Sequence, residues 1–195
     1  MNNPNEEHMG AVHRILRYLK MTPSQGICFK KSECRKVSIY TNADWVGSAL
    51  DRRSTSGYCS FVWGNLVTWR NKKQSVVSRS SAEAEFRALA QGICEGIWLK
   101  RLLEELRVPN ATPIELLCDN QATISIAKNP VHHDRTKHVE IGRHFIKEKI
   151  EMEVIKLNYV PTNSQIADIF TKALPRTQFE VLCSKLGMIN IYCPA

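Results

Sequence analysis

Apolar and polar residues alternate along the early part of the chain in a pattern that predicts β-strands. Val37 to Thr41 alternates, Gly57 to Trp63 is rich in aromatic and β-branched residues, and Leu66 to Trp69 follows the turn at Gly64-Asn65. Alternation buries one face of a strand, and a glycine-containing pair between two such segments is typical of a hairpin. The pattern therefore predicts three consecutive antiparallel strands.

Two longer segments repeat apolar residues at spacings of three and four, which predicts amphipathic helices. The first runs from about Glu6 to Lys20, and a short extended segment follows it at Gly26 to Phe29. The second begins at the capping signal Ser80 to Glu83 and ends before Pro109. Its apolar positions are Phe86, Leu89, Ala90, Ile93, Ile97, Leu102, Leu103 and Leu106.

The rest of the chain alternates short apolar strands with helices. The predicted strands are Ile114 to Cys118 and Glu153 to Val160. The predicted helices are Asn120 to Lys128, Lys137 to Ile150, Ile166 to Ala173 and Thr177 to Leu186. Hairpin-linked strands followed by helical crossovers specify an α/β fold with a mixed five-stranded sheet.

Composition excludes several classes of protein and favours a polyanionic partner. The 195 residues are 43% hydrophobic, which suffices for an ordinary core. No apolar run reaches the roughly 18 to 20 residues that span a bilayer, and the start lacks the apolar core of a signal peptide. Seven cysteines without a Cys-x-x-Cys pair indicate reduced thiols. We therefore expect an intracellular protein with no membrane partner, and the net charge of +8 favours nucleic acid.

Acidic residues stand where predicted elements begin or end, so they could converge. Asp119 ends a strand, Glu85 lies in the first turns of the long helix, and Asp168 lies in a late helix. In phosphodiester hydrolysis, two divalent ions about 3.5 to 4 Å apart activate a water and stabilise the leaving oxygen. Magnesium needs few carboxylates besides waters and phosphate oxygens. The sequence therefore predicts a phosphodiester-cleaving site with two Mg²⁺ or Mn²⁺ ions.

A series of short motifs between about Val37 and Leu174 resembles the ribonuclease H domain at the end of the Pol polyprotein of copia-type retrotransposons. One motif alone is weak evidence, but the ordered set is highly specific. The motifs are Asn42-Ala43-Asp44-Trp45, Asp51-Arg52-Arg53-Ser54-Thr55-Ser56-Gly57-Tyr58, Val67-Thr68-Trp69-Arg70, Lys72-Lys73-Gln74, Ser80-Ser81-Ala82-Glu83-Ala84-Glu85, Cys118-Asp119-Asn120, Thr136-Lys137-His138 and Ala167-Asp168-Ile169-Phe170-Thr171-Lys172. The resemblance implies a ribonuclease H-like fold, with helices on both faces of the sheet, and cleavage of the RNA strand of RNA–DNA hybrids.

The segments on either side of this domain are assigned to separate units. Residues 1–35 resemble the tail of a reverse transcriptase followed by a linker, 36–175 form the ribonuclease H-like domain, and 176–195 form a C-terminal helix and tail. No polymerase, protease or integrase motif is present, so we expect a piece of a longer element. The resemblance implies a reverse transcriptase in the parent polyprotein as a partner and a cytoplasmic virus-like particle as the location.

Carrying the family's acidic positions onto this chain gives Asn42, Glu85, Asp119 and Asp168. Asn42 stands at the first position, where an amide cannot supply the negative charge that a metal ion needs. Asp44, two positions further on, is the stand-in if the strand continues that far, because alternate strand residues share a face. For the second position Glu85 is preferred, since Phe-Arg-Ala-Leu follows it, and Glu83 stays open as the alternative.

Basic side chains concentrate around the predicted hairpins. They are Arg52, Arg53, Arg70, Lys72, Lys73 and Arg79. We expect this strip to contact the phosphates of a hybrid duplex. The alternative is that these residues form an ordinary solvated face of the hairpins. Recognition of the hybrid would then rest on backbone, shape and 2′-hydroxyl contacts rather than on base edges.

Histidines and tryptophans suggest two further interpretations. A zinc site is the alternative for four clustered histidines, whose spacing fits none of the common zinc patterns: His132, His133, His138 and His144. The tryptophans could stack on bases, but we expect at least three of the four to fill the core: Trp45, Trp63, Trp69 and Trp98.

Three functions remain open from the sequence. The preferred one is a retrotransposon-derived ribonuclease H whose activity is weakened by Asn42. The second is a catalytically inactive module that binds hybrids. The third is a truncated remnant of the element with no selected role.

Overall fold

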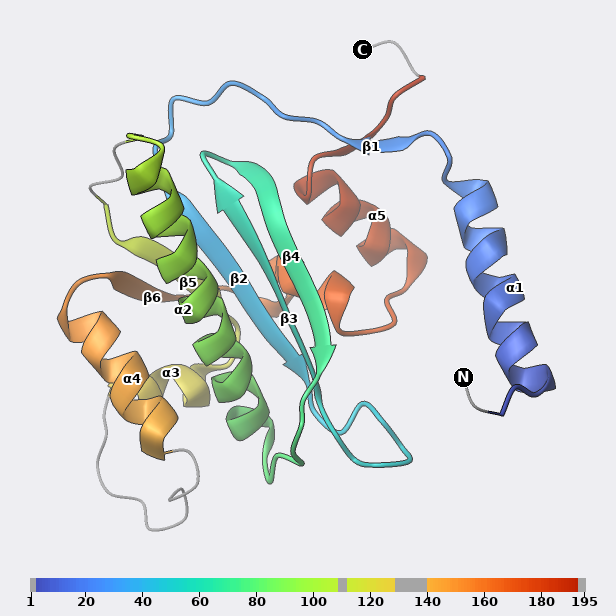
Figure 1. Ribbon diagram of the computed structural model, residues 1–195, viewed down its shortest axis with the longest axis horizontal. Coiled ribbons are helices and arrows are strands. Elements are labelled where there is room, and N and C mark those ends of the chain that lie inside the picture. Colours follow the sequence, from blue (N-terminus) through green and yellow to red (C-terminus); the bar gives the residue numbers. More distant parts are fainter. Residues whose placement is uncertain (1–2, 109–111, 129–139, 193–195) are drawn as a thin grey trace.

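The computed structural model describes residues 3–108, 112–128 and 140–192, and a five-stranded mixed sheet forms its centre (Figure 1). The strands are β2 (Val37–Asp44), β3 (Thr55–Val62), β4 (Asn65–Lys73), β5 (Ile114–Cys118) and β6 (Ile155–Tyr159). They lie in the order β4-β3-β2-β5-β6. β2, β3 and β4 pair antiparallel, whereas β5 runs parallel to both β2 and β6. The predicted mixed five-stranded sheet is confirmed.

Helices cover both faces of the sheet, as predicted (Figure 1). One face carries α2 (Ser81–Glu105), α3 (Gln121–Lys128) and α4 (Glu140–Glu151), and the other carries the 3-10 helix η3 (Ile166–Phe170) and α5 (Arg176–Lys185). A short 3-10 helix, η2 (Thr162–Ser164), leads from β6 to η3.

Strand alternation divides the apolar side chains of β2 between two cores. Ile39 points toward α2 and belongs to the larger core, together with Phe86 and Leu89. Tyr40 points the other way and packs against the smaller core, which contains Cys59, Phe61, Leu66, Ile166 and Leu186. β2 therefore lies between the long helix and η3, and its residues reach both layers.

Two predicted helices differ in the structure. The helix predicted over residues 166–173 is shorter and is a 3-10 helix: η3 ends at Phe170, and the Thr171 N–H bonds to the Asp168 carbonyl three residues back. The start of the helix predicted from Lys137 lies outside the described residues, and α4 is described from Glu140.

Segments near the two ends of the chain meet in a small sheet, of which only the extended segment at Gly26 to Phe29 was predicted from the sequence. β1 (Gln25–Ile27) pairs antiparallel with β7 (Met188–Asn190) (Figure 1). Three-residue strands carry too little alternation to be recognised in a sequence. Leu182 and Leu186 of the C-terminal segment are buried, so this segment packs against the domain. The division of the chain into three units stays a prediction.

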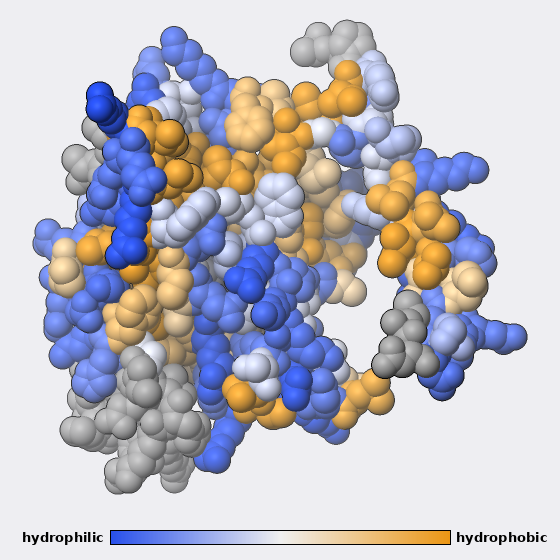
Figure 2. Space-filling view, in the orientation of Figure 1, coloured by the Kyte–Doolittle hydropathy of each residue, from blue (hydrophilic) through white to orange (hydrophobic). Residues whose placement is uncertain are grey.

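The N-terminal helix α1 (Glu6–Met21) confirms the predicted amphipathic helix but leaves its apolar side chains exposed. Its exposed apolar residues are Met9, Val12, Ile15, Leu16, Tyr18 and Leu19. Figure 2 shows apolar side chains on the part of α1 nearest the rest of the molecule, with open space between the two. In the described part of the chain, none of the helices is long and apolar enough to cross a membrane.

The prediction that at least three tryptophans fill the core is wrong. Trp45, Trp69 and Trp98 are exposed by 46%, 52% and 51%, and Trp63 is partly buried beneath Arg35. The reason is topological for Trp69, because β4 is the edge strand and its second half extends beyond the packed core. Among the described residues, six cysteines are free thiols, in agreement with the predicted reduced state.

α2 approaches β2 closely because two of its residues lack side chains. A Cβ atom built on Gly92 would lie 2.4 Å from Cγ2 of Thr41, and one on Gly96 would lie 2.9 Å from Cδ1 of Ile39. Real Cβ atoms do not approach so closely, so a larger residue would push the helix away from the sheet. This close approach places the first turn of α2 beside the end of β2.

Gly92→Ala is expected to destabilise the fold by about 1 to 3 kcal/mol, because overpacking outweighs the higher helix propensity of alanine. Gly10→Ala in α1 is the matched control, since a Cβ atom there has nothing within 4 Å. Urea unfolding of the two variants measures the difference in the free energy of unfolding. Equal stability of the two variants would contradict the close contact.

Candidate active site

The structure brings the four predicted positions to one end of the sheet. Asn42 lies in β2, Glu85 in the first turns of α2, Asp119 directly after β5, and Asp168 in η3. Parallel β2 and β5 end at the same edge, which is why residues far apart in sequence meet there. Ligand atoms of Glu85, Cys118 and Asp119 lie within 4.8 Å of one another.

Glu85 is buried at the contact between α2 and β2, with 6% of its surface exposed. Its Oε1 accepts a hydrogen bond of 2.9 Å from the Ala43 N–H, and its Oε2 has no hydrogen-bond partner among the described residues. Burial raises the pKa of Glu85 from 4.5 to about 8, against the effect of the Ala43 N–H, and the charge of Asp119 adds to the rise. A cation beside Oε2 would stabilise the charged form of Glu85, which burial disfavours.

Glu83, the alternative for the second position, is engaged elsewhere. Its carboxylate accepts a hydrogen bond from the Arg79 N–H at 2.9 Å and forms an ion pair with Arg87 at 2.9 Å. Its own N–H bonds to the Ser80 side chain, so Glu83 serves the N-terminal cap of α2. The geometry favours Glu85 for the site.

Asp119 is partly buried and held by a residue from the other side of the site. Thr162 Oγ1 donates a 2.9 Å hydrogen bond to its Oδ2. The neighbouring Cys118 is fully buried, and burial together with the charge of Glu85 raises the pKa of its thiol to about 12. A thiol that stays protonated is a poor ligand, so Glu85 and Asp119 supply the donor atoms of this group.

Asp168 is buried and bonded to a lysine. Lys172 Nζ lies 2.9 Å from Asp168 Oδ1. Burial raises the pKa of Asp168, the bond to Lys172 opposes the rise, and the charges of Asp119 and Asp44 add to it. For Lys172, burial lowers the pKa, but the hydrogen bond to Asp168 and the charges of Asp168, Asp119 and Glu85 outweigh it and raise the pKa. The sequence analysis missed Lys172, although its spacing of four from Asp168 was a usable signal.

Asn42 is fully buried, and its amide is oriented by η3. Its Nδ2 donates a 2.5 Å hydrogen bond to Thr171 Oγ1, which also lies within bonding distance of the Asp168 carbonyl. Its Oδ1 finds no partner within the described ranges. Gly57 lies opposite Asn42 in β3, where a Cβ atom would come within 2.7 Å of Thr171 Cγ2. Gly57 therefore leaves the space in which Thr171 reaches Asn42.

Strand β2 continues as far as Asp44, which is the condition under which Asp44 could replace the missing carboxylate at position 42. Asp44 therefore shares a face with Asn42, and its charge acts on Asp168. Its carboxylate lies over its own turn, since a Cβ atom on Gly47 would come within 2.2 Å of Asp44 Oδ2. Asp44 as a stand-in for the missing carboxylate stays a prediction.

The carboxylates fit a divalent cation. Glu85 and Asp119 offer the hard oxygen donors that Mg²⁺ and Mn²⁺ take. Two buried oxygens without a partner in the described chain, Oε2 of Glu85 and Oδ1 of Asn42, are further acceptors for a cation or its waters. For the zinc alternative, three of the four histidines fall outside the described residues, and the fourth, His144, is exposed.

The six basic residues are all exposed, but they do not form one continuous strip. Arg70 and Lys72 share one face of edge strand β4, and Lys73 lies on the other face. Asp51 pairs with Lys73 at 3.3 Å and with Arg53 at 3.8 Å. Of the six basic residues, Arg70 and Lys72 therefore share one face of β4, and neither forms an ion pair with Asp51.

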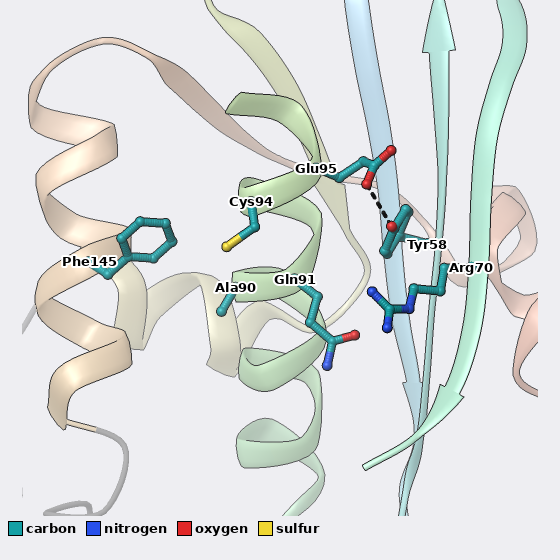
Figure 3. A pocket seen from close by; sticks show the side chains of 7 residues that line it. All are labelled: Tyr58, Arg70, Ala90, Gln91, Cys94, Glu95 and Phe145. Atoms are coloured by element: carbon teal, nitrogen blue, oxygen red, sulfur yellow. Dashed lines mark hydrogen bonds between the residues drawn. The ribbon is translucent and has the colours of Figure 1, made fainter. Parts of the chain in front are cut away.

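A separate hollow of about 330 Å³ lies between β3–β4 and the helices α2 and α4 (Figure 3). Figure 3 shows Arg70 and Tyr58 on its strand side and Phe145 on its α4 side. The Tyr58 hydroxyl donates a 2.7 Å hydrogen bond to Glu95. This hollow contains none of the carboxylates of the candidate site.

Comparisons with known proteins agree with this fold. LC11-RNase H1, isolated from compost by a metagenomic approach, matches with a TM-score of 0.53 at 16% identity, over 71% of this chain and 94% of the other. The fold is that of the ribonuclease H class. No family model matches the sequence.

Sequence relatives place the chain more narrowly. It is 40% identical over 191 residues to the retrovirus-related Pol polyprotein from transposon RE1 of Arabidopsis thaliana, and 38% identical over 188 residues to that from transposon TNT 1-94 of Nicotiana tabacum. These matches cover 98% and 96% of this chain but only 13% and 14% of the relatives. Over almost its whole length the chain is therefore similar to one part of retrotransposon Pol polyproteins, it has the ribonuclease H fold, and it spans about an eighth of the length of these relatives.

The raised pKa of Glu85 predicts that folding stability falls as pH rises. Between the ordinary value of 4.5 and about 8, the folded state binds more protons than the unfolded state. From about pH 5 to about pH 9 in EDTA, Glu85 alone should therefore lower the free energy of unfolding by about 4 kcal/mol. Urea unfolding across this range measures the slope. Glu85→Gln should flatten it, and an unchanged slope in this variant would contradict the assignment.

Proposed function

We propose that this chain is a ribonuclease H that cleaves the RNA strand of RNA–DNA hybrids with Mg²⁺ or Mn²⁺. The observation that carries the proposal is the convergence of Glu85, Asp119 and Asp168 at one edge of a ribonuclease H fold. Similarity to retrovirus-related Pol polyproteins supports it, since we expect the parent element to make DNA from RNA. A hybrid duplex is then the substrate that the chain would meet.

Each acidic residue has a neighbour that fixes its orientation. The Ala43 N–H fixes Glu85, Thr162 fixes Asp119, and Lys172 fixes Asp168. Divalent ions bound at such carboxylates activate the attacking water and stabilise the leaving oxygen. The role of the protein is to hold the carboxylates in place before the substrate arrives, which reduces the cost of reorganisation during the reaction.

Asn42 makes the site weaker than a site with four carboxylates. The amide keeps one oxygen, Oδ1, but lacks the negative charge that would neutralise a cation. Its Nδ2 already bonds to Thr171, so Oδ1 is the atom left for a ligand. We infer that the site holds metal and turns over substrate more weakly than it would with aspartate.

Substrate contact is proposed for the face of β4 that carries Arg70 and Lys72. Both side chains are exposed and lie on the same face of the edge strand. Exposed lysine and arginine on one face neutralise phosphates without reading bases. Half-exposed Trp69 lies on the other face of the same strand, the face that also carries Lys73.

The specific observation at Asn42 also favours a second candidate, a module that binds hybrids without cleaving them. Loss of one carboxylate affects catalysis, whereas the exposed basic residues are unaffected by it. Salt-sensitive binding without cleavage would support this candidate. A chain that neither folds nor binds would instead be a remnant of the element.

A polymerase partner is proposed for α1. Six exposed apolar residues on one helix form an apolar surface of the kind that marks a contact with another protein. The relatives that match this segment are polyproteins several times longer than this chain. We propose that the apolar side of α1 packs against the reverse transcriptase part of such a polyprotein.

Asn42→Asp should raise cleavage of a labelled RNA–DNA hybrid about tenfold or more, because a tenfold change needs only about 1.4 kcal/mol of transition-state stabilisation. Asp119→Asn should abolish the cleavage of both wild type and Asn42→Asp. Gel analysis of the cleaved RNA with Mg²⁺ or Mn²⁺ measures both effects. Unchanged rates in both variants would refute the assigned site.

Lys72→Ala should weaken binding of a hybrid duplex and reduce the slope of log affinity against log salt by about one, because one phosphate contact is lost. Lys156→Ala is the matched control, since Lys156 is exposed on β6, at the opposite edge of the sheet. Fluorescence anisotropy at several salt concentrations measures the slope. If both variants lose equal affinity, the face of β4 is not the contact surface.

A further inference from the structure

Lys172 places a positive charge inside the acidic site. Its Nζ lies 2.9 Å from Asp168 Oδ1, and its main-chain N–H bonds to the Asp168 carbonyl at 3.0 Å. The side chain of Asp168 is 2% exposed and that of Lys172 is 34% exposed, so the pair is largely shielded from water. The charge of Lys172 also acts on Asp119 and Glu85.

The other side of the site is open to a cation. Glu85 and Asp119 have ligand atoms within 4.8 Å of each other, and Asp168 does not belong to this group. Glu85 is more than nine-tenths buried, and its Oε2 lacks a partner in the part of the chain that the structure describes. The two halves of the site therefore differ: Asp168 is paired with an ammonium group, whereas Glu85 has an acceptor oxygen without a partner.

Charge leads to the same division. The carboxylates of Glu85, Asp119 and Asp168, together with that of Asp44 and the ammonium of Lys172, leave three negative formal charges. One divalent ion neutralises two of them, whereas a second would leave an excess of positive charge beside buried groups, which is costly. Asn42 adds no charge to offset that excess.

We propose that the chain by itself binds one divalent cation, at Glu85 and Asp119, and that the ammonium group of Lys172 holds the second cation position, at Asp168. A second ion enters only when Lys172 moves away from Asp168. Lys172 is thus a positioning residue that sets how many ions the site takes. The inference rests on the proposed function, because it uses the same carboxylates.

A purely structural role for the ion pair makes a different prediction. A pair spaced by four residues can stabilise η3 without affecting any ion. In that case, removing the lysine would lower the stability of the fold and leave the number of bound ions unchanged. Ion counting therefore separates the two roles.

The experiment counts Mn²⁺ ions on the full chain without nucleic acid, by electron paramagnetic resonance of free Mn²⁺ and by calorimetric titration. Wild type should bind one ion, and Lys172→Met should bind two or bind its second ion at least tenfold more tightly. Lys172→Gln, which keeps polarity and loses the charge, should behave in the same way. Lys156→Met, on the exposed side of β6, should bind one ion like wild type.

Two equally tight ions in wild type would overturn the inference, and this count needs no variant to fold. A single ion in both lysine variants, or no ion in wild type, would also overturn it. Hybrid binding and cleavage are measured separately on the same preparations. Wild type that cleaves hybrid but binds two ions would refute only this inference, whereas one bound ion with neither binding nor cleavage of hybrid would refute only the proposed function.

Discussion

The hydrogen bond from the Ala43 N–H to Glu85 is the contact on which the candidate site depends. It ties the first turns of α2 to the end of β2, and it can form only because Gly92 and Gly96 let the helix lie close to the sheet. The same strand turns Asn42 toward η3 on the opposite face. A shift of α2 would therefore move Glu85 away from Asn42 and from the end of β5 together.

Buried acidic groups lie close together in the site, and keeping them charged there lowers the free energy of unfolding. Desolvation raises the pKa values of Glu85 and Asp168, and the charge of Asp119 adds to the rise of both. The structure relieves this in three ways: a backbone N–H at Glu85, the Thr162 hydroxyl at Asp119, and the Lys172 ammonium at Asp168. A bound cation would relieve it further, because a ligand that binds only the folded state stabilises that state.

Asn42 and Lys172 change the site in the same direction, since both reduce its negative charge. The amide is not a steric defect, because Thr171 accepts a hydrogen bond from its Nδ2 and Gly57 leaves room for Thr171. The fold therefore accommodates Asn42 without rearrangement of β2. The consequence that we propose for Asn42 is electrostatic, and it concerns metal affinity rather than the architecture.

Alternation and capping signals in the sequence predicted the order of strands and helices, and the resemblance of its motifs implied the ribonuclease H class and the four acidic positions, with Asn42 at the first. Those features are local, because alternation, capping signals and ordered motifs depend on residues close together in the chain. The sequence could not determine the β1–β7 pair, the 3-10 form of η3 or the exposure of the tryptophans. The packing of the folded chain places Glu85, and not Glu83, beside Asp119. It also pairs Asp51 with Lys73 and brings the charge of Lys172 close to Asp119 and Glu85. The reason is physical: the electrostatic neighbours of a side chain are set by the packing of distant segments, which no local pattern in the sequence records.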